Sequence, residues 1–320
     1  TLTGLGNHWD KGWHEHEHYQ KGKNFIQDGL SKGIFTELED GAVLTDLKKY
    51  NIPDTILLKR DGTSLYITQD VALTALKKEY YRAQKLIWVI GPEQSLVMKQ
   101  LFAVCEQLGV GRFDDFTHVT YGYVGLKDGD NGFKKMSSRE GTVILIDDVI
   151  DVVKNKINAK FESEGKKDMS TLKEVSEKMA VAAVKFNLLK SDRNQNLVFD
   201  IDKSVETTGD SGVYVLYTYV RTKSILRKVL LKNTEINFPK EMSPEALDVS
   251  RSLMFFPRTI ERSLEGLSVH HVAQHLLSLC SSFNSWYSKE TILDNSAHQS
   301  YKVAITEAVG NVLQNGLAIL

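Results

Sequence analysis

The most constraining feature of the sequence is the segment of residues 86–108, which predicts a buried strand, a turn and a helix. Residues 86–90 form the continuous apolar run LIWVI, which is typical of a parallel strand covered on both faces. Gly91, Pro92, Glu93 and Gln94 follow, and an amphipathic helical pattern then continues to residue 108. This order is half of a βαβ unit. It predicts an α/β part of the chain whose ligands bind beyond the carboxyl ends of the strands.

Polar side chains fall where those ligands are expected. Residues 56–68 predict a β-hairpin around Asp61 and Gly62, after which Thr68 can cap a helix that runs to about residue 82. Tyr66, Asp70 and Gln94 then supply a hydroxyl, a carboxylate and an amide, which together suit a guanidinium group. Each residue also has a structural interpretation: Asp70 could complement a helix dipole, Tyr66 could be a half-buried strand residue, and Gln94 could be a turn residue.

A second candidate site is the basic loop of residues 134–141, KKMSSREG. Lysine ammonium groups, serine hydroxyls and a terminal glycine are suited to bind a polyphosphate. The loop lies between a strand-like segment at residues 117–124 with a turn at 128–132 and a helical pattern at 147–157. A solvated turn is the alternative interpretation of the loop.

The rest of the chain is predicted to be helical. Residues 151–157 and 172–189 have helical patterns, joined by a polar connection at 158–169, and residues 197–202 lead into a last domain. Apolar residues recur at helical spacing in residues 247–253, 255–257, 269–279 and 301–320, which predicts a helix bundle.

Residues 211–232 combine tyrosines with basic residues and contain no acid. Aromatic rings can stack unpaired bases while basic groups hold phosphates, so this stretch is a candidate RNA-binding helix. The candidate RNA contacts are Tyr214, Tyr217, Arg221 and Lys228, together with Trp286 and Tyr287 further along. A core helix with a solvated basic side is the alternative, and Trp286 and Tyr287 could equally fill the core.

Composition sets the outer limits. The 320 residues, 42% of them hydrophobic, suffice for about two domains, and the net charge of −1 means that RNA binding would need local basic clusters. Cys105 and Cys280 lie in apolar helical patterns, which indicates buried thiols in a reducing compartment and a cytoplasmic protein without a membrane span. His14, His16 and His18 alternate with glutamates in what we expect to be an exposed strand or loop and not a metal site.

The motifs, taken in order, resemble those of the arginyl-tRNA synthetases, a class I synthetase family. The resemblance covers essentially the whole chain and rests on DGTSLYITQD at residues 61–70, VIGPEQ at 89–94, KQLF at 99–102, His118 with Gly122, and KMSSREG at 135–141. It implies a Rossmann-like catalytic part followed by a helical anticodon-binding domain. We expect residues 1–150 to belong to the former, 151–202 to connect, and 203–320 to form the latter.

The resemblance also implies roles. By position, Tyr66, Asp70 and Gln94 would bind arginine, while Gly91, His118 and Gly122 would lie near ATP. Lys135, Met136, Ser137, Ser138 and Arg139 match a loop that closes on ATP, with Lys135, Ser137, Ser138 and Arg139 assisting catalysis. The implied reaction is ATP-dependent activation of arginine, assisted by Mg²⁺, and its transfer to tRNA-Arg by a monomer.

The sequence departs from the family in several places. In the basic loop, Ser138 and Glu140 stand where relatives commonly have basic residues, and Val97 stands where a histidine is common. In the candidate RNA-binding helix, Val213 and Leu216 replace the usual proline and glutamine. No His-x-Gly-His motif is present in the sequence. We therefore expect the chain to be the carboxyl-terminal half or more of a synthetase, inactive by itself. The alternative function is a non-catalytic RNA-binding module derived from a synthetase.

Overall fold

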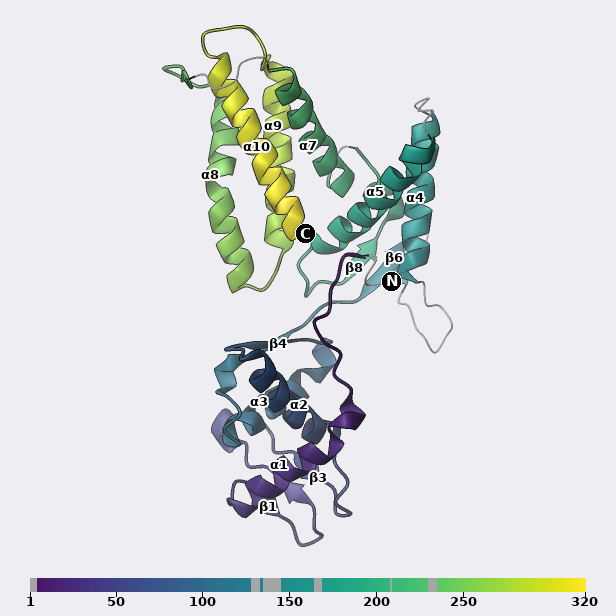
Figure 1. Ribbon diagram of the computed structural model, residues 1–320, viewed down its shortest axis with the longest axis vertical. Helices are drawn as coiled ribbons and strands as arrows, with labels where there is room; N and C mark the ends of the chain where they lie inside the picture. Colours follow the sequence, from purple (N-terminus) through teal and green to yellow (C-terminus); the bar gives the residue numbers. More distant parts are fainter. Residues whose placement is uncertain (1–4, 128–132, 135–144, 164–168, 208, 230–234) are drawn as a thin grey trace. The chain divides into compact units, whose positions relative to one another are not determined.

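The computed structural model describes residues 5–127, 133–134, 145–163, 169–207, 209–229 and 235–320. These residues form two compact units (Figure 1). The amino-terminal unit is His8–Gly122. The carboxyl-terminal unit is Tyr123–Leu320 together with the described residues that precede His8.

The amino-terminal unit begins with helices and a small antiparallel sheet. Its first elements are η2 (Glu15–Glu17), α1 (Tyr19–Ser31), β1 (Thr36–Glu37), β2 (Val43–Leu44), η3 (Lys48–Tyr50) and β3 (Ile56–Leu58). The strand order is β1-β2-β3, and each neighbouring pair is antiparallel. Gly33, with φ of +69°, follows α1, because glycine tolerates the left-handed backbone that ends a helix.

The predicted strand, turn and helix of residues 86–108 are confirmed, but the strand is not covered on both faces as expected, since Ile87 is 50% and Val89 is 67% exposed. The elements in this part are α2 (Tyr66–Tyr81), β4 (Leu86–Val89), η4 (Pro92–Gln94), α3 (Ser95–Gln107), η5 (Phe113–Asp115) and β5 (Phe116–Val119). β4 pairs with β5 in parallel, with Trp88 opposite His118. The apolar faces of α1, α2 and α3 meet in one core that contains Ile26, Val71 and Leu101, each fully buried.

The predicted β-hairpin of residues 56–68 is wrong in its second strand. β3 ends at Leu58, Ser64 forms only an isolated bridge to it, and α2 begins at Tyr66 with Leu65 as its N-cap. Thr68 therefore lies inside the first turn of α2, where its hydroxyl donates a hydrogen bond to the carbonyl of Leu57. Tertiary contacts determine the conformation of this segment. As a helix, it places Ile67 and Val71, four residues apart, on one face that is buried in the core.

The carboxyl-terminal unit opens with a mixed sheet covered by helices. Its first elements are β6 (Val124–Lys127), β7 (Phe133–Lys134), α4 (Ile146–Ser163), α5 (Met169–Leu189), β8 (Leu197–Phe199) and α6 (Ile201–Ser204). The strand order is β7-β6-β8, with β6 antiparallel to β7 and parallel to β8. α4 packs against α5 around a core that includes Val153, Val184 and Phe199.

A helix bundle completes this unit (Figure 1). It consists of α7 (Gly212–Arg227), α8 (Pro244–Glu265), α9 (His270–Lys289) and α10 (Gln299–Ile319). Serine hydroxyls start two of these helices: Ser211 accepts a hydrogen bond from the Tyr214 N–H and Ser243 accepts one from the Ala246 N–H. α8 packs on α9 and α10 packs on α7, which confirms the predicted bundle. The fold is thus an α/β part followed by an all-α part.

Several predicted boundaries differ from the structure. The strand-like stretch at residues 117–124 is divided between β5 and β6, and residues 158–163, expected to be a polar connection, extend α4. Ala159, Lys160 and Glu162 of that extension are good helix formers, so helical propensity continues beyond the apolar pattern. Both cysteines of the chain lie in its described part and are free, buried thiols, as predicted.

Candidate functional site

Candidate ligand-binding residues gather at the carboxyl ends of β4 and β5. Because the two strands are parallel, Gly91 and Gln94 after β4 lie at the same sheet edge as Gly122 after β5. His118 lies within β5, and its Nε2 is 3.1 Å from the carbonyl oxygen of Ile90, the last residue before Gly91. The edge thus brings together Gly91, Gln94, His118 and Gly122, as the sequence predicts.

The chain turns tightly after β4. The carbonyl of Gly91 accepts a hydrogen bond from the Gln94 N–H at 3.1 Å, and the carboxylate of Glu93 lies over the side of Gly91 where a Cβ would be. This tight turn brings backbone to the strand edge without a side chain, which suits the close approach of a ligand. The Gln94 side chain is exposed beside it.

Tyr66 and Asp70 lie on successive turns of α2. Their spacing of four residues places them on one helix face, with the Tyr66 side chain 77% exposed and Asp70 half-buried. Burial, with a smaller contribution from the charge of Asp70, raises the pKa of Cys105 on α3 to about 12, so Asp70 lies near α3. Asp70 is therefore on the side of α2 that faces α3, the helix following Gln94, while the Tyr66 side chain one turn earlier extends into solvent.

The start of α2 is fixed by close backbone packing. Gly22 of α1 lies so near Thr68 that an added Cβ would be 2.6 Å from the Thr68 carbonyl oxygen. Thr68 is fully buried and is also tied to Leu57 through its hydroxyl. The backbone that carries Tyr66 and Asp70 is therefore held from two sides.

The predicted phosphate loop lies outside the described residues, except for Lys134 at the end of β7. Its candidate site residues beyond that point are Lys135, Met136, Ser137, Ser138 and Arg139. Among the described residues no group of three or more His, Cys, Asp and Glu side chains is arranged to hold a metal ion. His14 is exposed in a loop, as expected, and His16 is also exposed but lies in the short helix η2 in place of a strand or loop.

A cation flanked by two aromatic rings lies on α7 and α9 of the bundle. The guanidinium carbon of Arg221 is 4.9 Å from the ring centroid of Tyr217 and 5.0 Å from that of Tyr287. Both distances are within the range of cation–π attraction. Tyr217 and Tyr287 are 50% and 40% exposed, so the three side chains form an accessible cluster, which we call the Arg221 cluster.

A groove of about 310 Å³ continues from this cluster. Lys228, the C-cap of α7, lines it together with Tyr287 and Lys289 of α9. The structure therefore brings together four of the six predicted RNA contacts: Tyr217, Arg221, Lys228 and Tyr287.

The remaining two predicted RNA contacts, Trp286 and Tyr214, contact other residues of the bundle. Trp286 is fully buried in the bundle core, so the expectation that its ring stacks a base is wrong. Its ring points about 100° away from that of the exposed Tyr287 and contacts Phe283 in the core at a centroid distance of 6.2 Å. Tyr214 is half-buried, and its hydroxyl accepts a hydrogen bond from Asn284.

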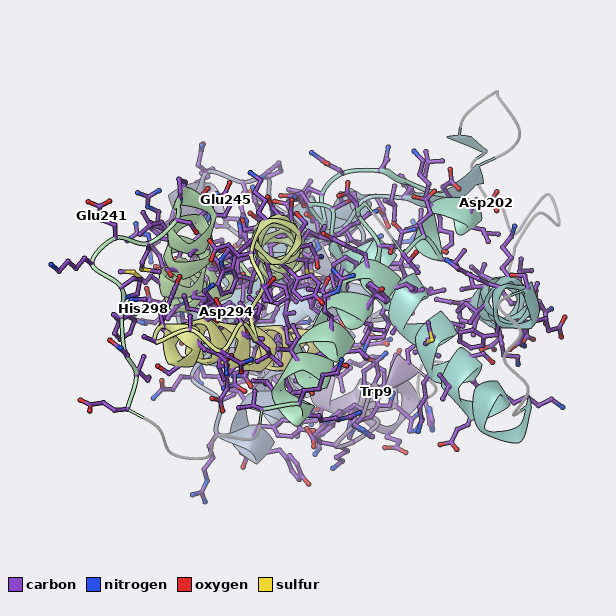
Figure 2. All side chains as sticks on the ribbon, turned by 90° about the horizontal axis from the view of Figure 1, so that it is seen from above. Trp9, Asp202, Glu241, Glu245, Asp294 and His298 are labelled. Carbon is purple, nitrogen blue, oxygen red and sulfur yellow. The ribbon has the colours of Figure 1, made fainter. Side chains whose placement is uncertain are left out.

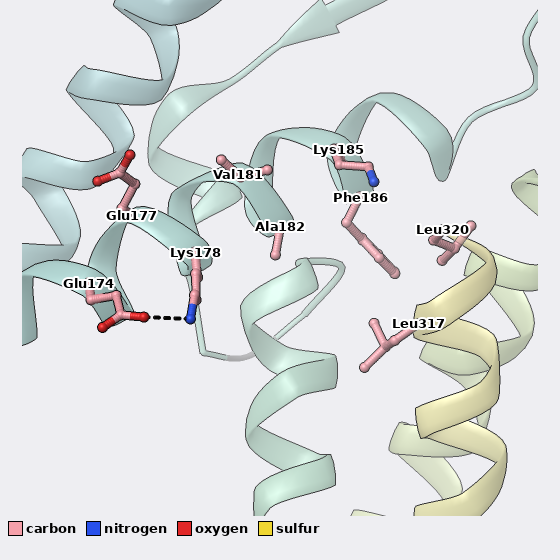
Figure 3. A pocket seen from close by; sticks show the side chains of 9 residues that line it. All are labelled: Glu174, Glu177, Lys178, Val181, Ala182, Lys185, Phe186, Leu317 and Leu320. Carbon is pink, nitrogen blue, oxygen red and sulfur yellow. Dashed lines mark hydrogen bonds and ion pairs between the residues drawn. The ribbon is translucent and has the colours of Figure 1, made fainter. Parts of the chain in front are cut away.

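The larger groove of the structure holds none of the predicted residues. It has a volume of about 570 Å³ and lies between α5 and the end of α10 (Figure 3). Val181, Phe186, Leu317 and Leu320 give it an apolar lining, and an ion pair of 2.7 Å between Glu174 and Lys178 lies along it.

No helix among the described residues is long and apolar enough to span a membrane.

Comparisons with known proteins agree with this arrangement. The family described as "tRNA synthetases class I (R), catalytic domain" matches residues 14–201, and the family described as "DALR anticodon binding domain" matches residues 215–320. An arginine–tRNA ligase of Streptococcus suis is 33% identical over 306 residues, which cover 93% of this chain and 53% of that protein. One of Lactococcus lactis is 33% identical over 317 residues, covering 99% of this chain and 55% of that protein. The chain thus spans about half the length of the curated relatives it matches.

The fold has a close counterpart among solved structures. The arginyl-tRNA synthetase of Thermus thermophilus superposes with a TM-score of 0.85 over 99% of this chain and 60% of its own, at 21% identity. The catalytic-domain match covers residues 14–201 of the 320, and the anticodon-domain match follows it in the same chain. The chain therefore belongs to the arginyl family of class I tRNA synthetases.

Proposed function

We propose that the chain provides the arginine-binding, part of the ATP-binding and the tRNA-binding surfaces of an ATP-dependent arginine–tRNA ligase. The observation that carries the proposal is the order of its two family matches, a catalytic domain at residues 14–201 and an anticodon-binding domain at 215–320. Relatives named arginine–tRNA ligase align across both parts. A non-catalytic RNA-binding module is not favoured, because the longer match is to a catalytic domain.

Arginine would be held by Tyr66, Asp70 and Gln94. A guanidinium group only donates hydrogen bonds, so it needs a carboxylate and neutral oxygens as acceptors. Asp70 offers the charge, Tyr66 offers an exposed hydroxyl on the same helix face, and Gln94 offers an exposed amide at the sheet edge. Their convergence on one ligand is the central element of the proposal.

ATP would bind at the edge formed by Gly91, His118 and Gly122, with the loop from Lys135 to Arg139 over its phosphates. The carboxylate of arginine would attack the α-phosphate, forming arginyl-adenylate and releasing diphosphate. Positive charge from Lys135 and Arg139 would stabilise the negative charge that develops on the leaving diphosphate. Mg²⁺ would assist as a counter-ion of the ATP phosphates.

The tRNA would meet the bundle at the Arg221 cluster and the adjoining groove. Exposed tyrosine rings stack unpaired bases, and arginine and lysine hold phosphates or base edges. Tyr217, Arg221, Tyr287 and Lys228 provide both kinds of group within one accessible region. A hydroxyl of the terminal ribose of the bound tRNA would then attack the carbonyl carbon of arginyl-adenylate, forming an ester with arginine and releasing AMP.

The arginine site can be tested by thermal unfolding with arginine and with citrulline. Citrulline has nearly the same shape but an uncharged ureido group, so Asp70 should discriminate between them. We expect arginine to raise the melting temperature, because a ligand that binds only the folded state stabilises it, and citrulline and lysine to have little effect. Asp70→Asn should abolish the arginine effect, and Glu79→Gln, an exposed carboxylate on the same helix, should preserve it.

Two outcomes would count against the arginine site. Equal stabilisation by arginine and citrulline would show that no carboxylate forms an ion pair with the guanidinium group. An arginine effect that survives Asp70→Asn would move the site away from α2. The tRNA surface is tested separately, by the affinity of the chain for a transcribed arginine tRNA with and without Arg221→Ala.

A further inference from the structure

Asn284 on α9 makes a set of hydrogen bonds that fixes how its side chain is oriented. Its Nδ2 atom donates to the hydroxyl of Tyr214 at 3.0 Å and to Oγ1 of Thr218 at 2.9 Å. An amide NH₂ has two hydrogens, so both are used by residues of α7. Its Oδ1 atom accepts a hydrogen bond from Nη1 of Arg221, also on α7.

The assignment of oxygen and nitrogen in this amide follows from its partners. A guanidinium only donates, so the atom facing Arg221 has to be the oxygen. The hydroxyl of Thr218 donates to the backbone carbonyl of Tyr214 at 3.0 Å, which leaves a lone pair of Thr218 for the Asn284 N–H. Thr218 is fully buried, so this acceptor is not shared with solvent. The flipped amide would lose its contacts with Arg221 and Thr218, and only the Tyr214 hydroxyl could reverse its role and donate to the amide oxygen.

The restraint reaches the accessible surface through Arg221. One edge of its guanidinium is bound to Asn284, and its Nη2 lies 3.3 Å from the hydroxyl of Tyr217. The rings of Tyr217 and Tyr287 flank it, and both are partly exposed. A flexible arginine otherwise loses much rotamer freedom when it binds, which weakens the affinity.

We propose that Asn284 is a positioning residue that holds Arg221 between Tyr217 and Tyr287, ready to contact an unpaired nucleotide of the bound tRNA. This inference rests on the proposed function, because it assumes that the Arg221 cluster binds RNA. Asn284 acts through Arg221 and does not itself touch the RNA. Replacing it therefore matters only as long as Arg221 is present.

The test is a double-mutant cycle in the full chain with a transcribed arginine tRNA as the probe. We expect Asn284→Ala to weaken the affinity about tenfold and Arg221→Ala to weaken it at least as much. The double variant should bind as weakly as Arg221→Ala alone, because a residue that acts only through Arg221 adds nothing once Arg221 is gone. Gln274→Ala is the matched control: it removes another amide of α9, one that donates to the Lys190 carbonyl at 3.3 Å, and should change the affinity less than twofold.

A second measurement needs no RNA. Hydrogen exchange at the Arg221 guanidinium, followed by NMR, should be slow in the wild-type chain and in Gln274→Ala and fast in Asn284→Ala. Thr218→Val removes one acceptor of the Asn284 amide with little change in shape, and should accelerate the exchange by a smaller factor. Melting temperatures of all variants, measured in parallel, confirm that binding is compared between folded proteins.

The outcomes separate this inference from the proposed function. The positioning role would be overturned, with tRNA binding intact, if the losses of tRNA affinity in Asn284→Ala and Arg221→Ala were additive in the double variant. It would also be overturned if Asn284→Ala left the hydrogen-exchange rate of the Arg221 guanidinium unchanged. An affinity for tRNA that is unaffected by Arg221→Ala would overturn the RNA role of the cluster and this inference with it. Non-additive losses together with faster exchange support it.

Discussion

Nζ of Lys302 on α10 lies 2.9 Å from Oδ2 of Asp294, in the loop that joins α9 to α10, and 3.4 Å from Oε2 of Glu290. The Lys302 side chain is only 12% exposed, and Asp294 is 27% exposed. Figure 2 labels Asp294 at this end of the bundle, together with Glu245, which pairs with Lys289 of α9. The lysine thus joins two acids that follow α9 to the first turns of α10.

Replacing Lys302 should destabilise the bundle. Lys302→Met keeps the apolar stem but leaves two partly buried carboxylates without their cation, which should lower the free energy of unfolding by about 1.5–3 kcal/mol. Arg251→Met is the control, since the Arg251–Asp248 pair is 67% and 62% exposed and should cost no more than about 0.5 kcal/mol. Urea denaturation measures both. Equal effects of the two variants would contradict the importance of burial.

The same contact makes bundle stability depend on pH in acid. Desolvation alone would raise the pKa of Asp294, but hydrogen bonds from Lys302 and from the Ser296 N–H outweigh it and lower the pKa from 3.8 to about 2. Because the folded value is the lower one, the ionised carboxylate stabilises the fold above pH 3.8, and this contribution disappears as the pH falls to about 2. The difference in unfolding free energy between wild type and Asp294→Asn should therefore shrink between pH 5 and pH 2. A constant difference would be inconsistent with the lowered pKa.

Neighbouring aromatic residues on α9 should separate stability from RNA binding. Trp286 is fully buried, so Trp286→Ala should lower the free energy of unfolding by about 3–5 kcal/mol. Tyr287 is 40% exposed, so Tyr287→Ala should cost only about 1 kcal/mol but weaken tRNA binding. Chemical denaturation and tRNA titration of both variants check this division. A stability loss of the same size for both would contradict it.

The aromatic pair also shows how far sequence reasoning reaches. Periodicity correctly predicted a helical segment before Trp286 but left open whether the rings of Trp286 and Tyr287 were buried. Consecutive helical residues point about 100° apart, so only one of them could share the exposed side with Tyr217 and Arg221. Which one does so is decided by α7 and α10, whose packing no local pattern encodes. Asn284 was overlooked for the same reason: a half-buried amide has no sequence signature.

In the amino-terminal unit, long-range packing overrode local strand propensity after a correctly predicted turn. Asp61 and Gly62 do form a turn, as their sequence predicts, with Gly62 at φ of +73°. The residues that follow were predicted as a strand because Leu65, Tyr66 and Ile67 have high strand propensity. They form the start of α2, because the backbone of its first turn packs closely against Gly22 of α1. By contrast, the position and parallel pairing of β4 were predicted correctly from its continuous apolar run, although Ile87 and Val89 leave one face of the strand exposed.

Both cysteines should be unreactive in the folded chain. Burial raises the pKa of Cys105 and of Cys280 to about 12, so almost no thiolate exists at pH 8. Labelling with Ellman's reagent should give no fast reaction in buffer and two reactive thiols in denaturing urea. The labelling rate should follow unfolding of each unit, since one cysteine lies in each. Rapid labelling of the native chain would show that one of the two cores is open.

The contact between Gly22 and Thr68 links packing to arginine binding. Alanine is a better helix former than glycine by about 1 kcal/mol, which favours Gly22→Ala in isolation. The added Cβ would however lie 2.6 Å from a backbone carbonyl that cannot rotate away, and overpacking of this kind costs about 1–3 kcal/mol. We expect a net loss of stability and, because the first turn of α2 must move with Tyr66 and Asp70, a weaker arginine effect on the melting temperature. Lys21→Ala, an exposed neighbour on α1, should preserve both properties. If Gly22→Ala is more stable than wild type and responds fully to arginine, then α1 does not fix the position of the arginine-binding turn.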